Sequence, residues 1–181
     1  MKDRVSKINN EFYKNFPEIY LKPSKVNKFL KKYTNEVEKE IKNKFLKLKL
    51  DKNFVIYANG GFGRKEIFPI SDIDISIVEK NKPKDFKHLE EFISFLWDQG
   101  YKVGHSVRTI SDIKKISKSD LKEYTSYLTR RPIISTNEID KKINYALSTL
   151  WTKNNFYLSL IHISEPTRPL YISYAVLCLK K

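Results

Sequence analysis

The sequence predicts an α+β domain in which short apolar strands alternate with amphipathic helices. Runs rich in β-branched and aromatic residues predict strands at 54–58 and 72–78, and the second run alternates polar and apolar with period two. Apolar residues three and four positions apart predict helices, as at Val37, Ile41 and Phe45. A chain of about 150 residues can bury a proper core, so one domain is expected.

The first half of the chain predicts an arm, a helix, a strand and a glycine turn. Residues 1–23 are polar with scattered aromatic residues and two prolines, which favours a loose arm. A long helix is expected over 27–49, with its many charges on a solvated face. The strand at 54–58 ends abruptly at Asn59-Gly60-Gly61, where a tight turn is expected, and a helix is expected to begin near Phe62 or Gly63.

The second half predicts two more strands and four helices. Asn81 and Pro83 mark a turn after the strand at 72–78. The expected elements that follow are a helix at 86–96 ending at Gly100, a strand at 102–109, a short helix capped by Ser111, and helices at 120–129 and 138–151 separated by a break at Pro132.

The glycine turn is a candidate phosphate-binding loop. Glycines adopt positive φ and carry no Cβ to hold a ligand away from the backbone. A helix that begins after Gly60 and Gly61 would direct its free N–H groups and its positive dipole end at an anion. Taken alone, however, a Gly-Gly pair most often marks only a turn.

Asp72 and Asp74 are candidate metal ligands. Side chains two residues apart on a strand point to the same face, with Cα atoms roughly 6–7 Å apart. Mg²⁺ prefers oxygen ligands and is usually held by one or two carboxylates together with substrate phosphates. An isolated Asp-x-Asp on a strand is most often a solvated face.

The combination is more informative than either motif. Both occur within residues 60–74, each on the element that its chemistry requires. The rival phosphate motifs do not fit, since the glycine turn lacks the third glycine of a dinucleotide fingerprint and the chain contains no Gly-Lys-Ser or Gly-Lys-Thr. The segment therefore predicts a nucleotidyl-transfer site.

Two blocks of this sequence resemble the bacterial PII-protein uridylyltransferase family. The first comprises Gly60-Gly61-Phe62-Gly63-Arg64, Glu66, Pro69 and Ser71-Asp72-Ile73-Asp74. The second is Phe95-Leu96-Trp97-Asp98-Gln99-Gly100-Tyr101-Lys102-Val103-Gly104-His105-Ser106-Val107-Arg108-Thr109. The resemblance covers roughly residues 25–145.

The resemblance implies a polymerase-β-like nucleotidyltransferase fold, with a small mixed β-sheet flanked by helices. It implies Mg²⁺-dependent transfer of UMP from UTP to a tyrosine of the PII nitrogen-regulatory protein. By position, Asp72 and Asp74 would be catalytic and would bind the metal. The residues expected to bind the nucleotide are Gly60, Gly61, Arg64, Ser71 and Arg108.

Two departures from the family pattern keep alternatives open. The superfamily commonly adds a third carboxylate from a neighbouring strand, but residues 101–110 contain none, and the nearest candidates are Asp112, Asp120 and Glu123. Thr129 stands where the family has a glutamate. A related nucleotidyltransferase with another acceptor, and an inactive nucleotide- or RNA-binding homologue, are the alternatives. For Arg64, a surface ion pair with Glu66 is the alternative role.

Residues 158–181 resemble a translated sequencing adapter. We expect this tail to be non-native and residues 24–157 to form a nucleotidyltransferase domain that is truncated at its C-terminal end. The resembled enzymes continue with a hydrolase domain of the HD type and two ACT domains, which this sequence lacks.

Charge, cysteine content and hydropathy argue against several other classes of protein. The net charge is +14, but the lysines are spread among acidic and apolar residues, which indicates a solvated helix face rather than a nucleic-acid surface. The single cysteine, Cys178, lies in the adapter-like tail, so neither a disulfide framework nor a cysteine zinc site is expected. The chain shows neither a signal peptide nor a membrane-spanning run, and the expected location is the cytoplasm.

Overall fold

The computed structural model describes residue 14, residues 23–81 and residues 86–150. The elements are α2 (Pro23–Lys47), the short 3₁₀ helix η1 (Leu50–Lys52), β1 (Phe54–Ala58), α3 (Gly60–Arg64), β2 (Ile73–Glu79), α4 (Lys87–Asp98), β3 (Val103–Arg108), α5 (Ile110–Ser119), α6 (Leu121–Leu128), β4 (Arg131–Ile134) and α7 (Asn137–Ser148). The expected arm, the adapter-like tail and part of the turn after residue 80 lie outside the described residues.

The four strands form one mixed sheet in the order β3-β2-β1-β4. Strand β1 pairs antiparallel with β2 and β4, whereas β2 and β3 are parallel and are joined through α4. A parallel pair needs such a crossover, because a hairpin can join only antiparallel strands. The predicted α+β class, with a small mixed sheet flanked by helices, is confirmed, and the arrangement is consistent with a polymerase-β-like fold.

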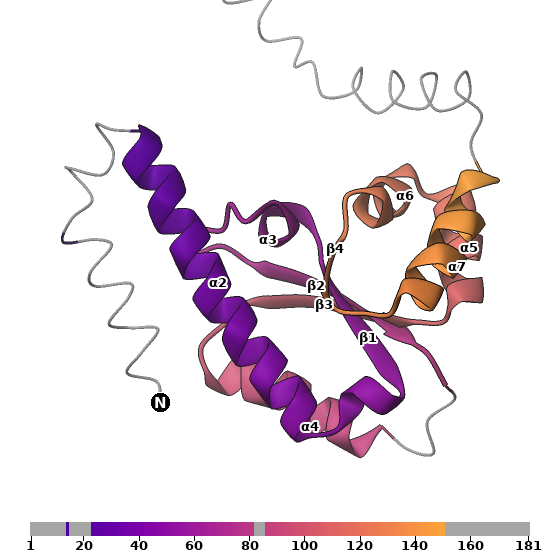
Figure 1. Ribbon diagram of the computed structural model, residues 1–181, viewed down its shortest axis with the longest axis horizontal. Coiled ribbons are helices and arrows are strands. Elements are labelled where there is room, and N and C mark those ends of the chain that lie inside the picture. The colour runs from indigo at the N-terminus through magenta and orange to yellow at the C-terminus, as the bar shows by residue number, and fades with distance from the viewer. Residues whose placement is uncertain (1–13, 15–22, 82–85, 151–181) are drawn as a thin grey trace, which may run out of the picture.

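Helices cover both faces of the sheet, as Figure 1 shows. On one face, buried side chains of α2 and α4, such as Ile41 and Phe92, pack against alternate residues of β1 and β2, such as Ile56 and Ile75. On the other face, side chains of α5, α6 and α7 pack against Val55, Tyr57 and Val78. Strand β1 is buried on both sides, which explains its continuous apolar run.

Strand register decides which polar residues share a face. Ser76 pairs with Tyr57, so the even-numbered residues of β2 face the α5–α7 side. On the other edge of β2, Asp74 pairs with Gly104 and Ser76 pairs with Ser106. The period of two therefore brings Asp74, Ser76 and Ser106 onto one face.

Four sequence expectations need correction. The helix after the glycine turn begins at Gly60, not near Phe62 or Gly63, because the N–H of Gly63 already bonds to the carbonyl of Asn59 at 2.8 Å. The short helix after β3 is capped by Thr109, whose side chain and that of Asp112 form a capping box, and not by Ser111. Strand β2 begins one residue after Asp72. The fourth concerns Pro132.

Pro132 lies in a strand that the sequence did not predict. Strand β4 pairs with β1 at the edge of the sheet, with Tyr57 opposite Pro132 and a register shift between Ile56 and Tyr57. An edge strand tolerates proline because one side of it has no ladder to complete. The break expected between the last two helices is thus a fourth strand.

Gly63 is expected to be essential for the packing of α3 against β1. A Cβ at this position would lie 2.8 Å from the carbonyl oxygen of Ala58, so the Gly63→Ala variant must displace backbone. We expect it to lose about 1–3 kcal/mol of unfolding free energy, measured by urea denaturation. Gly61→Ala is the matched control, since its Cβ would have no neighbour nearer than 3.8 Å. Equal stability of the two variants would contradict the prediction.

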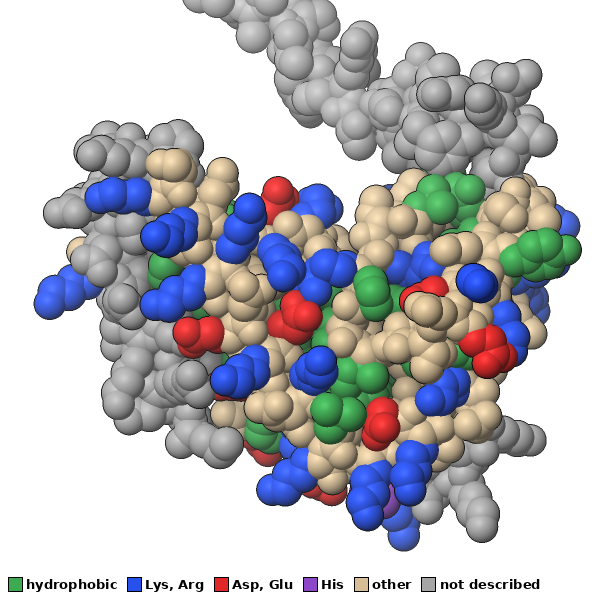
Figure 2. Space-filling view, in the orientation of Figure 1, with side chains coloured by type: hydrophobic (Ala, Val, Ile, Leu, Met, Phe, Trp, Pro, Cys, Tyr) green, Lys and Arg blue, Asp and Glu red, His purple; other side chains and the backbone are tan. Residues whose placement is uncertain are grey.

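The charged side chains are distributed as expected for lysines that face solvent. Figure 2 shows Lys and Arg side chains spread over α2 and over the α5–α7 side, with acidic side chains among them. Ion pairs such as Lys44 with Glu91 and Lys142 with Glu138 join some of them. Among the described residues, no helix has both the length and the apolar character needed to cross a membrane.

Candidate nucleotide and metal site

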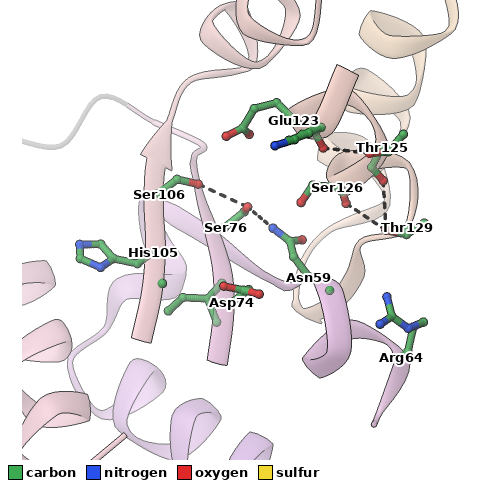
Figure 3. Close-up of a pocket in the computed structure, with 14 residues that line it drawn as sticks. Asn59, Arg64, Asp74, Ser76, His105, Ser106, Glu123, Thr125, Ser126 and Thr129 are labelled. Atoms are coloured by element: carbon green, nitrogen blue, oxygen red, sulfur yellow. Dashed lines mark hydrogen bonds between the residues drawn. The ribbon is translucent and has the colours of Figure 1, made fainter. Parts of the chain in front are cut away.

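A cavity of about 590 Å³ lies between the sheet and α6, next to the start of α3 (Figure 3). The sheet and α3 form one wall and one face of α6 forms the other. Its lining residues are Asn59, Gly60, Arg64, Asp74, Ile75, Ser76, Gly104, His105, Ser106, Lys122, Glu123, Thr125, Ser126 and Thr129.

The carboxylate of Asp74 lies between Gly60 and Gly104 and leaves no room for a side chain at either of these two positions. A Cβ at Gly60 would lie 3.0 Å from Oδ2 of Asp74, and a Cβ at Gly104 would lie 2.6 Å from Oδ1. Gly60 also has a φ of +53°, a conformation that side-chain-bearing residues rarely adopt. The carboxylate of Asp74 therefore occupies space that only glycine leaves open at these positions of α3 and β3.

The two carboxylates are close enough to influence one another. Asp74 is exposed like Asp72, but loss of solvation at the sheet, and then the negative charge of Asp72, raise its pKa above the usual range. Asp72 is exposed and lies immediately before β2, outside the lining of the cavity. Both effects disfavour the ionised form of Asp74, and a cation held between the two carboxylates would reverse them.

Removing the charge of Asp74 is expected to stabilise the fold at neutral pH. Because the folded-state pKa is raised, ionisation of Asp74 costs the folded state more than the unfolded state. Wild-type stability should therefore fall as pH rises from the ordinary aspartate pKa through the raised one. We expect Asp74→Asn to have the higher Tm at pH 7 in EDTA, and the gap to close below the ordinary pKa. A wild type more stable than the variant at pH 7 would contradict this.

Arg131 holds α3 against the sheet and was not predicted from the sequence. Its guanidinium donates to the carbonyls of Gly63 at 2.9 Å and Phe62 at 3.2 Å, and lies 2.8 Å from a carboxylate oxygen of Glu38 on α2. Cationic groups are favourable at the C-terminal end of a helix, where carbonyls are free. Nothing in the local sequence signals this role, because Gly63 and Arg131 are 68 residues apart.

The predicted nucleotide-binding residues lie in different places. Gly60 and Arg64 line the cavity, although Nε of Arg64 also pairs with Glu66 at 2.9 Å as the alternative expected. Gly61 follows Gly60 in α3. Ser71 lies in a turn outside the cavity lining, where its hydroxyl accepts from the N–H of Phe68 at 3.3 Å.

The guanidinium of Arg108 forms an ion pair with a carboxylate of α6. Its guanidinium donates to both carboxylate oxygens of Glu123, at 2.5 and 3.1 Å, and this pairing raises its pKa further. The fork-to-fork geometry ties β3 to the first turn of α6. Arg108 itself is outside the cavity lining, but the helix that it holds forms a whole wall.

The three candidates for a third carboxylate each have another structural role. Asp112 completes the cap of α5, Asp120 caps α6, and Glu123 pairs with Arg108. No group of three His, Cys, Asp or Glu side chains suited to a metal occurs within residues 23–81 and 86–150. Thr129, at the position where a glutamate was expected, ends α6 at the cavity wall and donates to the carbonyl of Thr125 at 3.0 Å.

A hydroxyl-rich surface lines the rest of the cavity. On the sheet side, the amide of Asn59 donates to the hydroxyl of Ser76 at 2.5 Å, and Ser106 lies 3.4 Å from the same hydroxyl. Thr125, Ser126 and Thr129 face them from α6. The period of two that identifies Asp74 as a candidate also points to Ser76. That Ser76 lies across the cavity from α6 follows only from the tertiary fold.

Comparison with curated proteins confirms the resemblance seen in the sequence. The chain is 35% identical over 111 residues to the bifunctional uridylyltransferase/uridylyl-removing enzyme of Haemophilus influenzae (strain PittEE). It is 36% identical over 105 residues to that of Acinetobacter baylyi. Each match covers 56% of this chain and 12% of the relative, so the chain spans about an eighth of their length. No protein-family model matches the chain.

Two solved structures show a weak likeness. They are a toxin-antitoxin with AMP-PNP, at 18% identity and a TM-score of 0.40, and a mutant of the toxin-antitoxin MntA-HpeT, at 16% identity and a TM-score of 0.39. Each covers 59% of this chain and 84% of the matched chain.

Proposed function

We propose that this chain carries a nucleotidyltransferase site that transfers UMP from UTP to a tyrosine hydroxyl of a PII signalling protein in the cytoplasm, with Mg²⁺. The observation that carries the proposal is that the carboxylate of Asp74 lies beside a cavity, in space left open by Gly60 and Gly104. The similarity to bifunctional uridylyltransferase/uridylyl-removing enzymes supports the choice of UMP as the transferred group.

The two carboxylates fit a magnesium ion. Asp72 and Asp74 supply oxygen ligands, and a divalent cation would relieve the charge repulsion between them, which adds to desolvation in raising the pKa of Asp74. Two protein carboxylates are enough where substrate phosphates complete the coordination. Bound Mg²⁺ would stabilise the charge on the reacting phosphates.

The remaining residues position the triphosphate. The N–H groups of Gly60 and Gly61 at the start of α3 would bind its oxygens together with the guanidinium of Arg64; Gly60 and Arg64 line the cavity, which supports this assignment. In the reaction the tyrosine oxygen bonds to the α-phosphorus and the bond to the bridging oxygen breaks. Pyrophosphate leaves and the hydroxyl proton passes to solvent. Positioning and electrostatics supply most of the catalysis in such transfers.

A non-catalytic nucleotide-binding role is the second candidate, and the lack of a third carboxylate among the described residues favours it. The two functions share the cavity and the metal ligands but differ in whether product forms. A related enzyme with another acceptor would differ only in the protein that becomes labelled.

The test combines binding with transfer. Labelled UTP is incubated with the chain, Mg²⁺ and a PII protein, and the acceptor is examined for covalent UMP. Parallel reactions contain EDTA, or PII with its acceptor tyrosine changed to phenylalanine. We expect label on wild-type PII alone, and only with Mg²⁺. Mg²⁺-dependent UTP binding without label would instead support the non-catalytic function, and absence of UTP binding would refute both.

A further inference from the structure

The side-chain amide of Asn59 has a buried carbonyl oxygen that accepts no hydrogen bond from the described residues. The residue is 7% exposed, and its amide nitrogen donates to Oγ of Ser76. Its carbonyl oxygen, Oδ1, is buried and has no hydrogen-bond partner within the part of the chain that the structure describes. Such an atom is unfavourable unless a further group supplies a donor.

The surrounding contacts hold the amide in place. The backbone N–H of Asn59 donates to the carbonyl of Asp74 at 2.9 Å, and its own carbonyl accepts from Gly63 at 2.8 Å. Ser76, which holds the amide nitrogen, is itself 2% exposed. In Figure 3 the nitrogen of the Asn59 amide points toward Ser76 and its oxygen points away from Ser76.

The position of Asn59 indicates which part of a nucleotide would supply the donor. The residue directly precedes Gly60, so its side chain lies beside the expected phosphate end of the cavity. Phosphate oxygens are acceptors and would repel the carbonyl oxygen. The next group along a nucleoside triphosphate is the sugar, whose hydroxyls donate, and the base lies further away.

We propose that Asn59, held by Ser76, accepts a hydrogen bond from a hydroxyl of the ribose, so that the site binds a nucleotide more tightly than the analogue that lacks this hydroxyl. This inference rests on the proposed function, because it requires a nucleotide in the cavity. A site built to bond a hydroxyl discriminates against the analogue that lacks it, since its polar atom then stays unpaired.

The test measures dissociation constants for UTP, 2′-deoxy-UTP, 3′-deoxy-UTP and CTP by calorimetry, with Mg²⁺ and without acceptor protein. We expect wild type to bind UTP about tenfold more tightly than at least one deoxy analogue, equivalent to about 1.4 kcal/mol. Asn59→Ala should bind UTP and that analogue equally. The control Asn81→Ala, which removes an exposed amide bonded to the carbonyl of Lys52, should keep the tenfold ratio.

The ratio of two ligands on one variant is unaffected by partial unfolding, so a less stable Asn59→Ala remains informative. Equal binding of UTP and both deoxy analogues by wild type would overturn the inference, as would an unchanged ratio in Asn59→Ala. Loss of UTP-over-CTP preference instead would assign the bond to the base and also overturn it. If wild type binds no nucleotide, the proposed function fails as well, which distinguishes that failure from the others.

Discussion

Replacing Asp72 and Asp74 together by asparagine is expected to lower the rate of UMP transfer at least about 10³-fold, or roughly 4 kcal/mol. The two amides keep the size of the side chains but remove the negative charge that would hold Mg²⁺. The fold should survive, because ionised Asp74 is disfavoured in the folded state. Single-turnover rates over a range of Mg²⁺ concentrations would measure the loss.

A second pair of carboxylates provides the control for this variant. Glu90 and Asp98 are exposed on α4, which packs on the opposite face of the sheet. Changing them to Gln and Asn alters the net charge by the same amount without touching the cavity, so transfer should stay near the wild-type rate. Transfer that survives in the Asp72→Asn/Asp74→Asn variant would show that the metal is held elsewhere.

Gly104→Ala is expected to reduce transfer by about 10²-fold with little loss of stability. The added Cβ would lie 2.6 Å from Oδ1 of Asp74, so the carboxylate must move from its position beside the cavity. A displacement of about 1 Å in a reacting group is enough for an effect of this size. Because Gly104 lies on an exposed part of β3, the change should leave the core intact.

Gly104→Ala keeps the carboxylate of Asp74 but displaces it, so this variant tests the position of the carboxylate and not its presence. We expect Gly104→Ala to need more Mg²⁺ for half-maximal transfer while its Tm stays within a few degrees of wild type. Lys102→Ala, an exposed neighbour just before β3, controls for changes at this end of the strand. Wild-type transfer and wild-type Mg²⁺ dependence in Gly104→Ala would show that transfer does not depend on the present position of the Asp74 carboxylate.

Local sequence patterns determined most of the elements and picked out residues that line the cavity of the proposed site. The apolar run at 54–58, the period of two after Asp72 and the helical spacing in α2 and α4 each reflect burial within one element, which local sequence records. Motif chemistry likewise picked out Gly60 and Asp74, which do lie together at the cavity. The uridylyltransferase resemblance was visible in two continuous blocks.

Tertiary structure alone decided how distant segments combine. Pro132 predicted a break, but the edge of the sheet offered it a strand position that a proline can occupy. Arg131 reaches α3 across 68 residues, and Gly104 meets Asp74 only through the parallel pairing of β3 with β2. Asn59 looked like part of a turn until its buried oxygen proved to have no partner in the described chain. Contacts of this kind depend on packing between elements, for which a local pattern carries no signal.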